Sequence, residues 1–332
     1  MSPIRLAMIG AGLFARDAHV PAILSHDDLF HIAAVCSRTE ESARRLADLL
    51  PYSTEVVTDV DALLARDDID AVDVVMPIET MPDTVQKALR AGKHVISEKP
   101  IAPDVATGKA LLAVPRDAGQ VWMLAENWRY EEAHSTAARA IADGVIGKPI
   151  TCSWSLFIDM SPNNKYYSTE WRRTGTFPGG FLLDGGVHHV AALRMILGEI
   201  ESVAAYTAQM RPDLPPAETM TAALRFESGV IGTYTVTYAA GSAFPQPLVI
   251  VGEKGSLKLD RSEVEIAVDG ERTRHTFTYK GVDAELAAFA AAIQQGEPHL
   301  NTPEAGLQDV AVVEAMLQSA ETGQRIQPER FV

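Results

Sequence analysis

Lys99, Asp184 and His188 are the residues of this chain whose types best suit the chemistry of a hydroxyl group. Lys99 stands in the short motif Glu98-Lys99-Pro100, and the other two residues lie far downstream. A lysine stabilises a hydroxyl oxygen as its charge changes, a histidine takes a proton near neutral pH, and a carboxylate holds the imidazole in one tautomer. Together these residue types predict the oxidation of an alcohol or the reverse reduction.

The spacing of Asp184 and His188 supports this assignment. Residues four positions apart stack on one face of a helix, so both side chains can point at one substrate atom. Ligation of a metal by Asp184, His188 and His189 is an alternative, but adjacent histidines point in different directions on a helix, and we expect no metal. A second alternative is that His188 only caps or packs.

The segment Gly10-Ala11-Gly12-Leu13-Phe14-Ala15 has the spacing G-x-G-x-x-A between a strand pattern and a helical pattern. This is the context in which a glycine-rich loop binds a dinucleotide. Gly10 permits a tight turn, and Gly12 lets the backbone approach a pyrophosphate at a helix N-terminus. We expect Gly10, Gly12, Leu13 and Phe14 to contact the cofactor; a glycine turn without a ligand is the alternative.

The end of the second expected strand indicates which dinucleotide binds. A free ribose 2′-hydroxyl is held by Asp or Glu at this place, but the chain reads Cys36-Ser37-Arg38. Ser37 and Arg38 offer a hydroxyl and a guanidinium to a 2′-phosphate. We therefore expect NADP in preference to NAD; the alternative is that Arg38 is a solvated surface charge.

Short apolar runs alternate with amphipathic stretches in the first part of the chain. This pattern of βαβ units predicts a doubly wound parallel sheet with helices on both faces, a Rossmann domain, for which we assign residues 1–125. The expected strands are residues 4–9, 31–36, 71–76, 94–97 and 121–124, and the expected helices are residues 40–50, 59–64, 81–91 and 104–118.

The pattern then changes to alternating segments joined at glycine turns. Residues 126–332 are expected to form an α+β domain with a large, mostly antiparallel open sheet. The expected strands are residues 221–226, 230–238, 248–251, 256–259 and 264–268, and the expected helices are residues 135–143, 284–294 and 303–322.

Composition excludes some classes of function. The net charge of −15 repels nucleic acid and anionic membrane surfaces, so we expect neither as a partner. No segment has the length of a transmembrane helix or the pattern of a secretory signal, and we expect a cytoplasmic protein. Cys36 and Cys152 are too few for a disulfide framework and suit two inert, packed thiols.

Several motifs together resemble the Gfo/Idh/MocA family, named after glucose-fructose oxidoreductase and inositol dehydrogenase, and the resemblance covers essentially the whole chain. The motifs are GAGLFA at residues 10–15, AGKHVISEKP at residues 91–100, AENWRY at residues 125–130 and GGFLLDGGVHH at residues 179–189.

The resemblance implies an NAD(P)-dependent dehydrogenase or reductase that acts on a sugar, a polyol or a related carbonyl compound. In that family the lysine of the EKP motif and the acid and histidine of a D-x-G-x-H motif are catalytic, and here they match Lys99, Asp184 and His188. The resemblance also implies a homodimer or homotetramer formed through the C-terminal sheet. Two alternatives remain: a non-catalytic NADP-binding sensor, and a glycosidase of the same family that uses NAD.

The chain departs from the common family pattern after its third expected strand. The family often has Pro-Asn-x-x-His there, whereas this chain has Pro77-Ile78-Glu79-Thr80-Met81, and Ala191 replaces a frequent aspartate. We therefore expect backbone contacts from this more apolar loop. Further cofactor contacts are expected from Pro77, Glu98, Lys99 and Asn127.

Residues 163–173 combine aromatic and arginine side chains. Aromatic faces cover the C–H side of a sugar ring while arginines bond its hydroxyls. We expect Trp171, Arg172 and His189 to contact a sugar-like substrate; core packing is the alternative for these rings.

Overall fold

The computed structural model describes residues 2–242, 244 and 246–332. The chain forms two compact units. Unit 1 contains Met1–Asn127 and Gly281–Leu307, and unit 2 contains Trp128–Lys280 and Gln308–Val332. The predicted domain boundary at residue 125 stays a prediction. Unit 1 also includes Gly281–Leu307, a later segment that we had assigned to the second domain.

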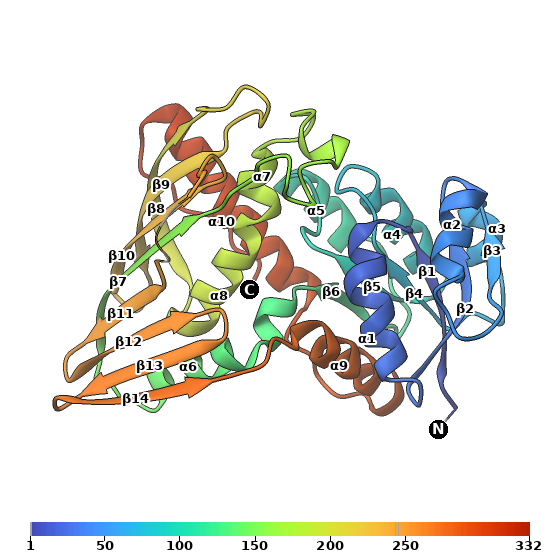
Figure 1. The fold of residues 1–332 in the computed structure, drawn as a ribbon, viewed down its shortest axis with the longest axis horizontal. Helices are drawn as coiled ribbons and strands as arrows, with labels where there is room; N and C mark the ends of the chain where they lie inside the picture. The colour runs from blue at the N-terminus through green and yellow to red at the C-terminus, as the bar shows by residue number, and fades with distance from the viewer. Residues whose placement is uncertain (1, 243, 245) are drawn as a thin grey trace. The chain divides into compact units, whose positions relative to one another are not determined.

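Unit 1 is built on a six-stranded parallel sheet with the order β3-β2-β1-β4-β5-β6 (Figure 1). This order confirms the predicted Rossmann fold, because the strand order reverses between β1 and β4. The short strand β3 was not predicted, since its three residues are all partly or fully exposed. The strands are β1 (Ile4–Ile9), β2 (Phe30–Cys36), β3 (Glu55–Val57), β4 (Ala71–Val74), β5 (His94–Glu98) and β6 (Trp122–Ala125).

Helices follow most strands of unit 1. The predicted helix 104–118 is shorter than expected, because Pro115 lacks the amide hydrogen that would continue it. The helices are the π-helical turn η1 (Ala15–His19), α1 (Val20–Ser25), α2 (Glu40–Ala47), α3 (Val60–Leu64), α4 (Met81–Arg90), α5 (Val105–Leu112) and α9 (Gly281–Gln295).

Unit 2 contains an eight-stranded sheet with the order β14-β13-β12-β11-β7-β10-β9-β8. Within this sheet, as far as the structure describes it, only β7 and β10 pair in parallel, so the sheet is mostly antiparallel, as predicted. We did not predict β7, β8 or β14, and every residue of β14 is exposed. The strands are β7 (Pro149–Phe157), β8 (Ile200–Ala208), β9 (Thr219–Phe226), β10 (Ile231–Thr237), β11 (Leu248–Gly252), β12 (Gly255–Asp260), β13 (Glu263–Val268) and β14 (Glu271–Thr276).

Helices cover one face of this sheet (Figure 1). The other face shows the alternation of an open sheet: along β9 and β10 every second residue is exposed or partly exposed. The helices of unit 2 are the 3-10 turns η2 (Asn127–Tyr130, whose first residue belongs to unit 1) and η3 (Glu170–Arg172), α6 (Glu132–Ala142), α7 (Gly180–Asp184), α8 (Gly186–Leu197) and α10 (Pro303–Thr322, whose start belongs to unit 1).

Two features of the described residues bear on location and redox chemistry. No helix among them combines the length and the apolar character needed to cross a membrane. Cys36 and Cys152 are free and buried. Burial raises the pKa of Cys152 to about 12, and burial together with the charge of Asp59 raises that of Cys36 to about 11. Neither thiol therefore forms a reactive thiolate near neutral pH.

Glu285 of α9 is a buried acid in unit 1. Its Oε2 accepts a long hydrogen bond from the amide of Asn301 (3.4 Å). Burial raises the pKa of Glu285 well above its ordinary value, and the charges of Glu98, Glu126 and Asp73 act in the same direction against that of His19. The native protein therefore keeps Glu285 protonated at a pH where the unfolded chain ionises it.

We expect stability to fall as pH rises above the ordinary pKa of glutamate. The folded pKa of Glu285 is the higher one, so unfolding releases its proton, with a slope of up to about 1.4 kcal/mol per pH unit. Glu285→Gln removes this proton release, and its stability relative to wild type should improve over the pH range above the ordinary pKa of glutamate. Urea unfolding across this range measures the effect. Glu297→Gln, at an exposed site beyond α9, is the control, and parallel curves for Glu285→Gln and wild type would contradict the expectation.

Candidate active site

The glycine-rich loop leaves β1 through a turn that requires glycine. Gly10 has φ +106°, and a Cβ there would lie 2.0 Å from the carbonyl oxygen of Val75. A Cβ on Gly12 would meet no atom within 4 Å, so packing of the protein itself does not demand glycine there. A glycine facing open space fits a ligand that approaches the backbone closely. The loop therefore suits the pyrophosphate of a dinucleotide.

The residues predicted to bind the cofactor gather at one edge of unit 1. In a parallel sheet all strands end at the same edge, and ligands bind where the strand order reverses. Here that point lies between β1 and β4. The residues that follow the carboxyl ends of successive strands are Gly10 after β1, Ser37 after β2, Pro77 after β4, Lys99 after β5 and Asn127 after β6.

The structure gives the surroundings of three residues that were predicted to contact the cofactor: Ser37, Arg38 and Glu98. Ser37 donates its backbone N–H to Val57, and the following Arg38 is exposed. Glu98, expected at the cofactor, turns its carboxylate inward, where its Oε1 lies 3.0 Å from Nε2 of His19. The predicted contact of Glu98 with the cofactor stays a prediction.

The loop that departs from the family pattern is anchored by its apolar residues. Ile78 and Met81 are buried, whereas Glu79 and Thr80 are exposed. The apolar side chains of this loop thus pack into the core of unit 1.

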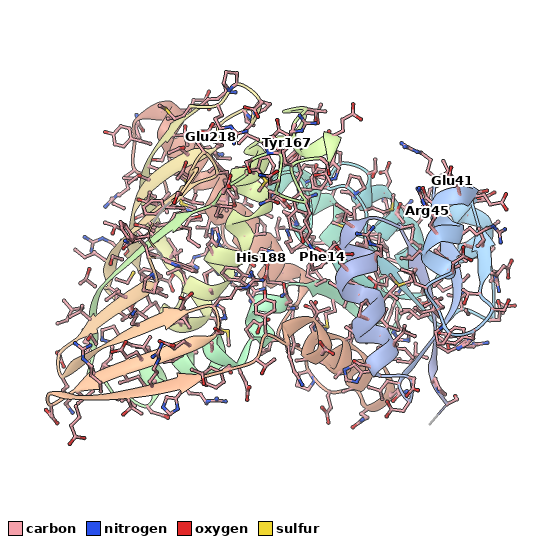
Figure 2. All side chains as sticks on the ribbon, in the orientation of Figure 1. Phe14, Glu41, Arg45, Tyr167, His188 and Glu218 are labelled. Carbon is pink, nitrogen blue, oxygen red and sulfur yellow. The ribbon has the colours of Figure 1, made fainter. Side chains whose placement is uncertain are left out.

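Asp184 and His188 lie on two short helices of unit 2 that meet at Gly185. Asp184 ends α7, and His188 lies in the first turn of α8 (Figure 2). The predicted single helix is therefore interrupted, but Gly185 keeps right-handed torsions (φ −90°, ψ −29°), and the His188 N–H bonds its carbonyl oxygen.

Arg172 is the partner of Asp184. Its Nε donates to Oδ2 of Asp184 at 2.7 Å, and both side chains are largely buried. The guanidinium also lies over the ring of Trp171, 4.1 Å from the centroid, and over that of Tyr166 at 5.1 Å. The loop that carries them is held at Tyr167 (Figure 2), whose hydroxyl donates to Asp213 (2.9 Å). The predicted substrate residues Trp171 and Arg172 are thus assembled beside Asp184.

The ring of His188 rests on Trp128, a residue that the sequence analysis did not select. The two rings are stacked, with centroids 5.2 Å apart and an interplanar angle of 13°. The guanidinium of Arg261 lies 6.0 Å from the centroid of Trp128. Stacking restricts the rotation of the imidazole, so Trp128 fixes its plane. The position of Trp128 next to Asn127 in the AENWRY motif was the available signal, but it did not indicate this contact.

His189 belongs to the core of unit 2. It is buried, and its Nδ1 lies 2.7 Å from the hydroxyl of Tyr234. Its predicted substrate contact stays a prediction, although this hydrogen bond directs the ring inward. In the part of the chain that the structure describes, no three His, Cys, Asp or Glu side chains form a group that could hold a metal.

Two sequence models of one oxidoreductase family match this chain. The model of the NAD-binding Rossmann fold of Gfo/Idh/MocA oxidoreductases matches residues 4–126, and the model of their C-terminal alpha/beta domain matches residues 138–327. The chain belongs to the Gfo/Idh/MocA family. The resemblance stated from the motifs is confirmed, and the chain is an NAD(P)-dependent oxidoreductase.

Individual relatives agree over nearly the full length. Dehydrogenase FPY6 of Fusarium mangiferae is 33% identical over 96% of this chain and 96% of its own. The 1,5-anhydro-D-fructose reductase of Ensifer adhaerens is 30% identical over 98% of both chains. The crystal structure of an oxidoreductase from Thermotoga maritima has 35% identity and a TM-score of 0.90, covering 98% of each chain.

Tyr238 lies against Gly185, the glycine at which the helices of Asp184 and His188 meet. Its hydroxyl is buried, and it has no hydrogen-bond partner among the residues that the structure describes. A Cβ on Gly185 would lie 1.8 Å from this oxygen and 3.0 Å from the ring carbon that bears it. Burial raises the pKa of Tyr238 far above its ordinary value, and the charge of Asp184 adds to the effect. The phenol is therefore neutral and packed onto Gly185.

Gly185→Ala is expected to destabilise the protein by about 1–3 kcal/mol and to displace Asp184, because the new methyl group overlaps the Tyr238 hydroxyl. The double variant Gly185→Ala/Tyr238→Phe should recover part of the loss, since phenylalanine lacks the oxygen that is struck but keeps the ring carbon 3.0 Å from the new methyl group. Thermal unfolding of both single variants and the double variant measures this. If the loss of stability in the double variant equals the sum of the two single losses, contact with Tyr238 is not the reason that residue 185 must be glycine.

Proposed function

We propose that the protein transfers a hydride between the nicotinamide of NADP and a carbon that bears a hydroxyl or carbonyl group in a sugar, a polyol or a related compound. The observation that carries the proposal is the position of Lys99 after β5, at the sheet edge where the glycine-rich loop leaves β1. The nicotinamide, when bound, supplies the hydride acceptor or donor. The chain's own residues then handle the oxygen and its proton.

The three catalytic candidates have separate roles in this proposal. In the oxidation direction His188 takes the proton of the substrate hydroxyl, and in reduction it returns that proton. Lys99 stabilises the negative charge that develops on the same oxygen. Asp184 bonds substrate hydroxyls together with Arg172, which already holds its carboxylate.

A sugar-like substrate suits the surroundings of Asp184. Arg172 can donate further hydrogen bonds to hydroxyl groups, and Trp171 and Tyr166 provide flat rings for the C–H face of a sugar. The names of the relatives support this class, since one is a reductase of 1,5-anhydro-D-fructose. We propose the class and leave the individual sugar to experiment.

NADP is the proposed cofactor because β2 ends without an acid and is followed by Ser37 and the exposed Arg38. Arg38→Ala should weaken NADP binding by about ten- to a hundredfold, as expected for the loss of charge-assisted bonds to a phosphate, and leave NAD binding nearly unchanged. Titration of protein fluorescence with each reduced cofactor gives both dissociation constants. A wild-type preference for NAD that survives Arg38→Ala would contradict the NADP assignment.

We also propose that the protein forms a homodimer or homotetramer through the open face of the unit 2 sheet. Every second residue of β9 and β10 faces outward, and exposed Ile231 and Tyr206 add apolar area. Light scattering that gives the mass of one chain at working concentration would remove this proposal. A cytoplasmic location stays a prediction.

The proposed function is tested by following the absorbance of reduced nicotinamide. Sugars, polyols and keto-sugars are screened with NADP, NADPH, NAD and NADH. The expected result is sustained turnover with at least one sugar-like compound. Tight cofactor binding without turnover of any compound would favour a sensor, and oxidised cofactor that is reduced only transiently while a glycoside is cleaved would favour a glycosidase.

A further inference from the structure

His19 is a fully buried histidine that lies between two carboxylates of unit 1. Its Nδ1 is 2.7 Å from Oδ2 of Asp73, and its Nε2 is 3.0 Å from Oε1 of Glu98. Asp73 is equally buried in the middle of β4, and the side chain of Glu98 is 10% exposed. The ring of Phe14, from the glycine-rich loop, meets His19 edge-on with centroids 5.3 Å apart.

The two carboxylates favour the charged form of the His19 imidazole. An ionised carboxylate only accepts hydrogen bonds, so an imidazole that bonds two of them donates from both nitrogens and carries a proton on each. Burial by itself lowers the pKa of His19, but the charges of Asp73 and Glu98 outweigh it and raise the pKa well above the ordinary value. Glu126 and Glu285 are the other acids near this cluster, and Glu285 is kept neutral by burial.

The three residues join the elements that form the nucleotide edge. His19 is the last residue of η1, a π-helical turn that follows the glycine-rich loop within one helical segment. π-Helical turns are rare and occur frequently at functional sites. Glu98 is the last residue of β5, and Lys99 follows it directly. The carboxylate of Glu98 is therefore fixed from the same helix that receives the cofactor.

We propose that His19 is a positioning residue that holds Glu98 and thereby sets the direction in which Lys99 leaves β5. The inference rests on the proposed catalytic role of Lys99. A buried ion cluster of this kind contributes little net stability compared with apolar residues of equal volume, because three charged groups lose their hydration. Its contribution is orientation: the imidazolium holds the carboxylate of Glu98 in one place, and the adjacent lysine keeps one direction of approach to the substrate oxygen.

The experiment compares wild type, His19→Gln, Lys99→Ala and the double variant His19→Gln/Lys99→Ala. Glutamine is neutral and carries both of its N–H donors on one nitrogen. It therefore cannot bond the two carboxylates from two separate nitrogens as the imidazolium does, and the clamp is weakened while a polar side chain remains. His94→Gln is the matched control, because His94 begins the same strand at its other end and only accepts a bond there from the Val121 N–H (3.0 Å). Hydrogen exchange of the peptides that contain Glu98 and Lys99 is measured for each protein, together with kcat, KM and the dissociation constant of the cofactor.

The expected result has two parts. His19→Gln speeds amide exchange around Glu98 and Lys99, leaves the strands of unit 2 unchanged, and lowers kcat about ten- to a hundredfold with KM and cofactor affinity within about threefold. In the Lys99→Ala background the same change lowers kcat by less than about threefold, because the positioned group is already gone. His94→Gln resembles wild type in every measurement.

Other outcomes overturn specific statements. Equal losses of kcat from His19→Gln in both backgrounds show that His19 does not act through Lys99. Wild-type exchange and wild-type kcat in His19→Gln remove the positioning role while the proposed function stands. Wild-type kcat in Lys99→Ala removes the catalytic role of Lys99, and hydrogen exchange then still reports whether His19 holds this turn. Exchange that rises evenly throughout unit 1 assigns His19 a purely structural role.

Discussion

Lys99→Ala and His188→Ala are each expected to lower kcat by about 10²- to 10⁴-fold, the range that one proton-transfer or oxyanion-stabilising group contributes. The cofactor should still bind to His188→Ala with its wild-type dissociation constant, because His188 belongs to unit 2 and the dinucleotide edge belongs to unit 1. Steady-state kinetics with the substrate found in the screen measure kcat, and fluorescence titration measures cofactor affinity.

The double variant Lys99→Ala/His188→Ala sharpens this expectation. Two groups that act on one oxygen work as a unit, so the double variant should fall only slightly below the weaker single variant. Lys109→Ala on the exposed side of α5 and His275→Ala on β14 are the matched controls and should keep wild-type kcat. Unchanged turnover in both Lys99→Ala and His188→Ala would refute the catalytic assignment. If the loss of kcat in the double variant equals the product of the two single losses, the two residues act independently of each other.

Asp309→Ala is expected to destabilise unit 2 by about 3–5 kcal/mol, because it leaves buried guanidinium charges without their shared carboxylate. Asp309 of α10 accepts from Arg129 through Oδ2 and from Arg194 through Oδ1, each at 2.5 Å. All three side chains are at most 7% exposed. Arg129 lies in η2 next to Trp128, and Arg194 lies in α8 with His188, so Asp309 joins the two elements that bring these rings together.

Urea unfolding followed by tryptophan fluorescence suits this test, since Trp128, Trp154 and Trp171 all belong to unit 2. Glu41→Ala is the control, because its ion pair with Arg45 on α2 is exposed to solvent (Figure 2) and should contribute almost nothing. Asp309→Asn keeps a hydrogen-bonding side chain and should lose less than Asp309→Ala. A midpoint for Asp309→Ala equal to that of Glu41→Ala would show that the buried cluster does not stabilise unit 2.

Much of the fold could be predicted because its signals are local. A buried parallel strand is a short apolar run in the sequence, and a hairpin is indicated by a glycine turn between two alternating segments. For this reason the predicted ends lie near the observed ends for β1, β4, β5, β9 and β10. β14 was missed because all its side chains are exposed and carry no apolar alternation. β3 was missed for a related reason: it has only three residues, and none of them is buried.

By itself the sequence determined the family, the Rossmann fold class of the first sheet, the open second sheet and the residue types for hydride transfer, since motifs and periodicity are properties of neighbouring residues. Only the tertiary structure decided the partners: His19 with Glu98, Trp128 with His188, and Asp309 with two arginines. These contacts join residues far apart in the chain, and no local pattern encodes which buried charge or ring will meet another. The strand order and helix packing bring them together.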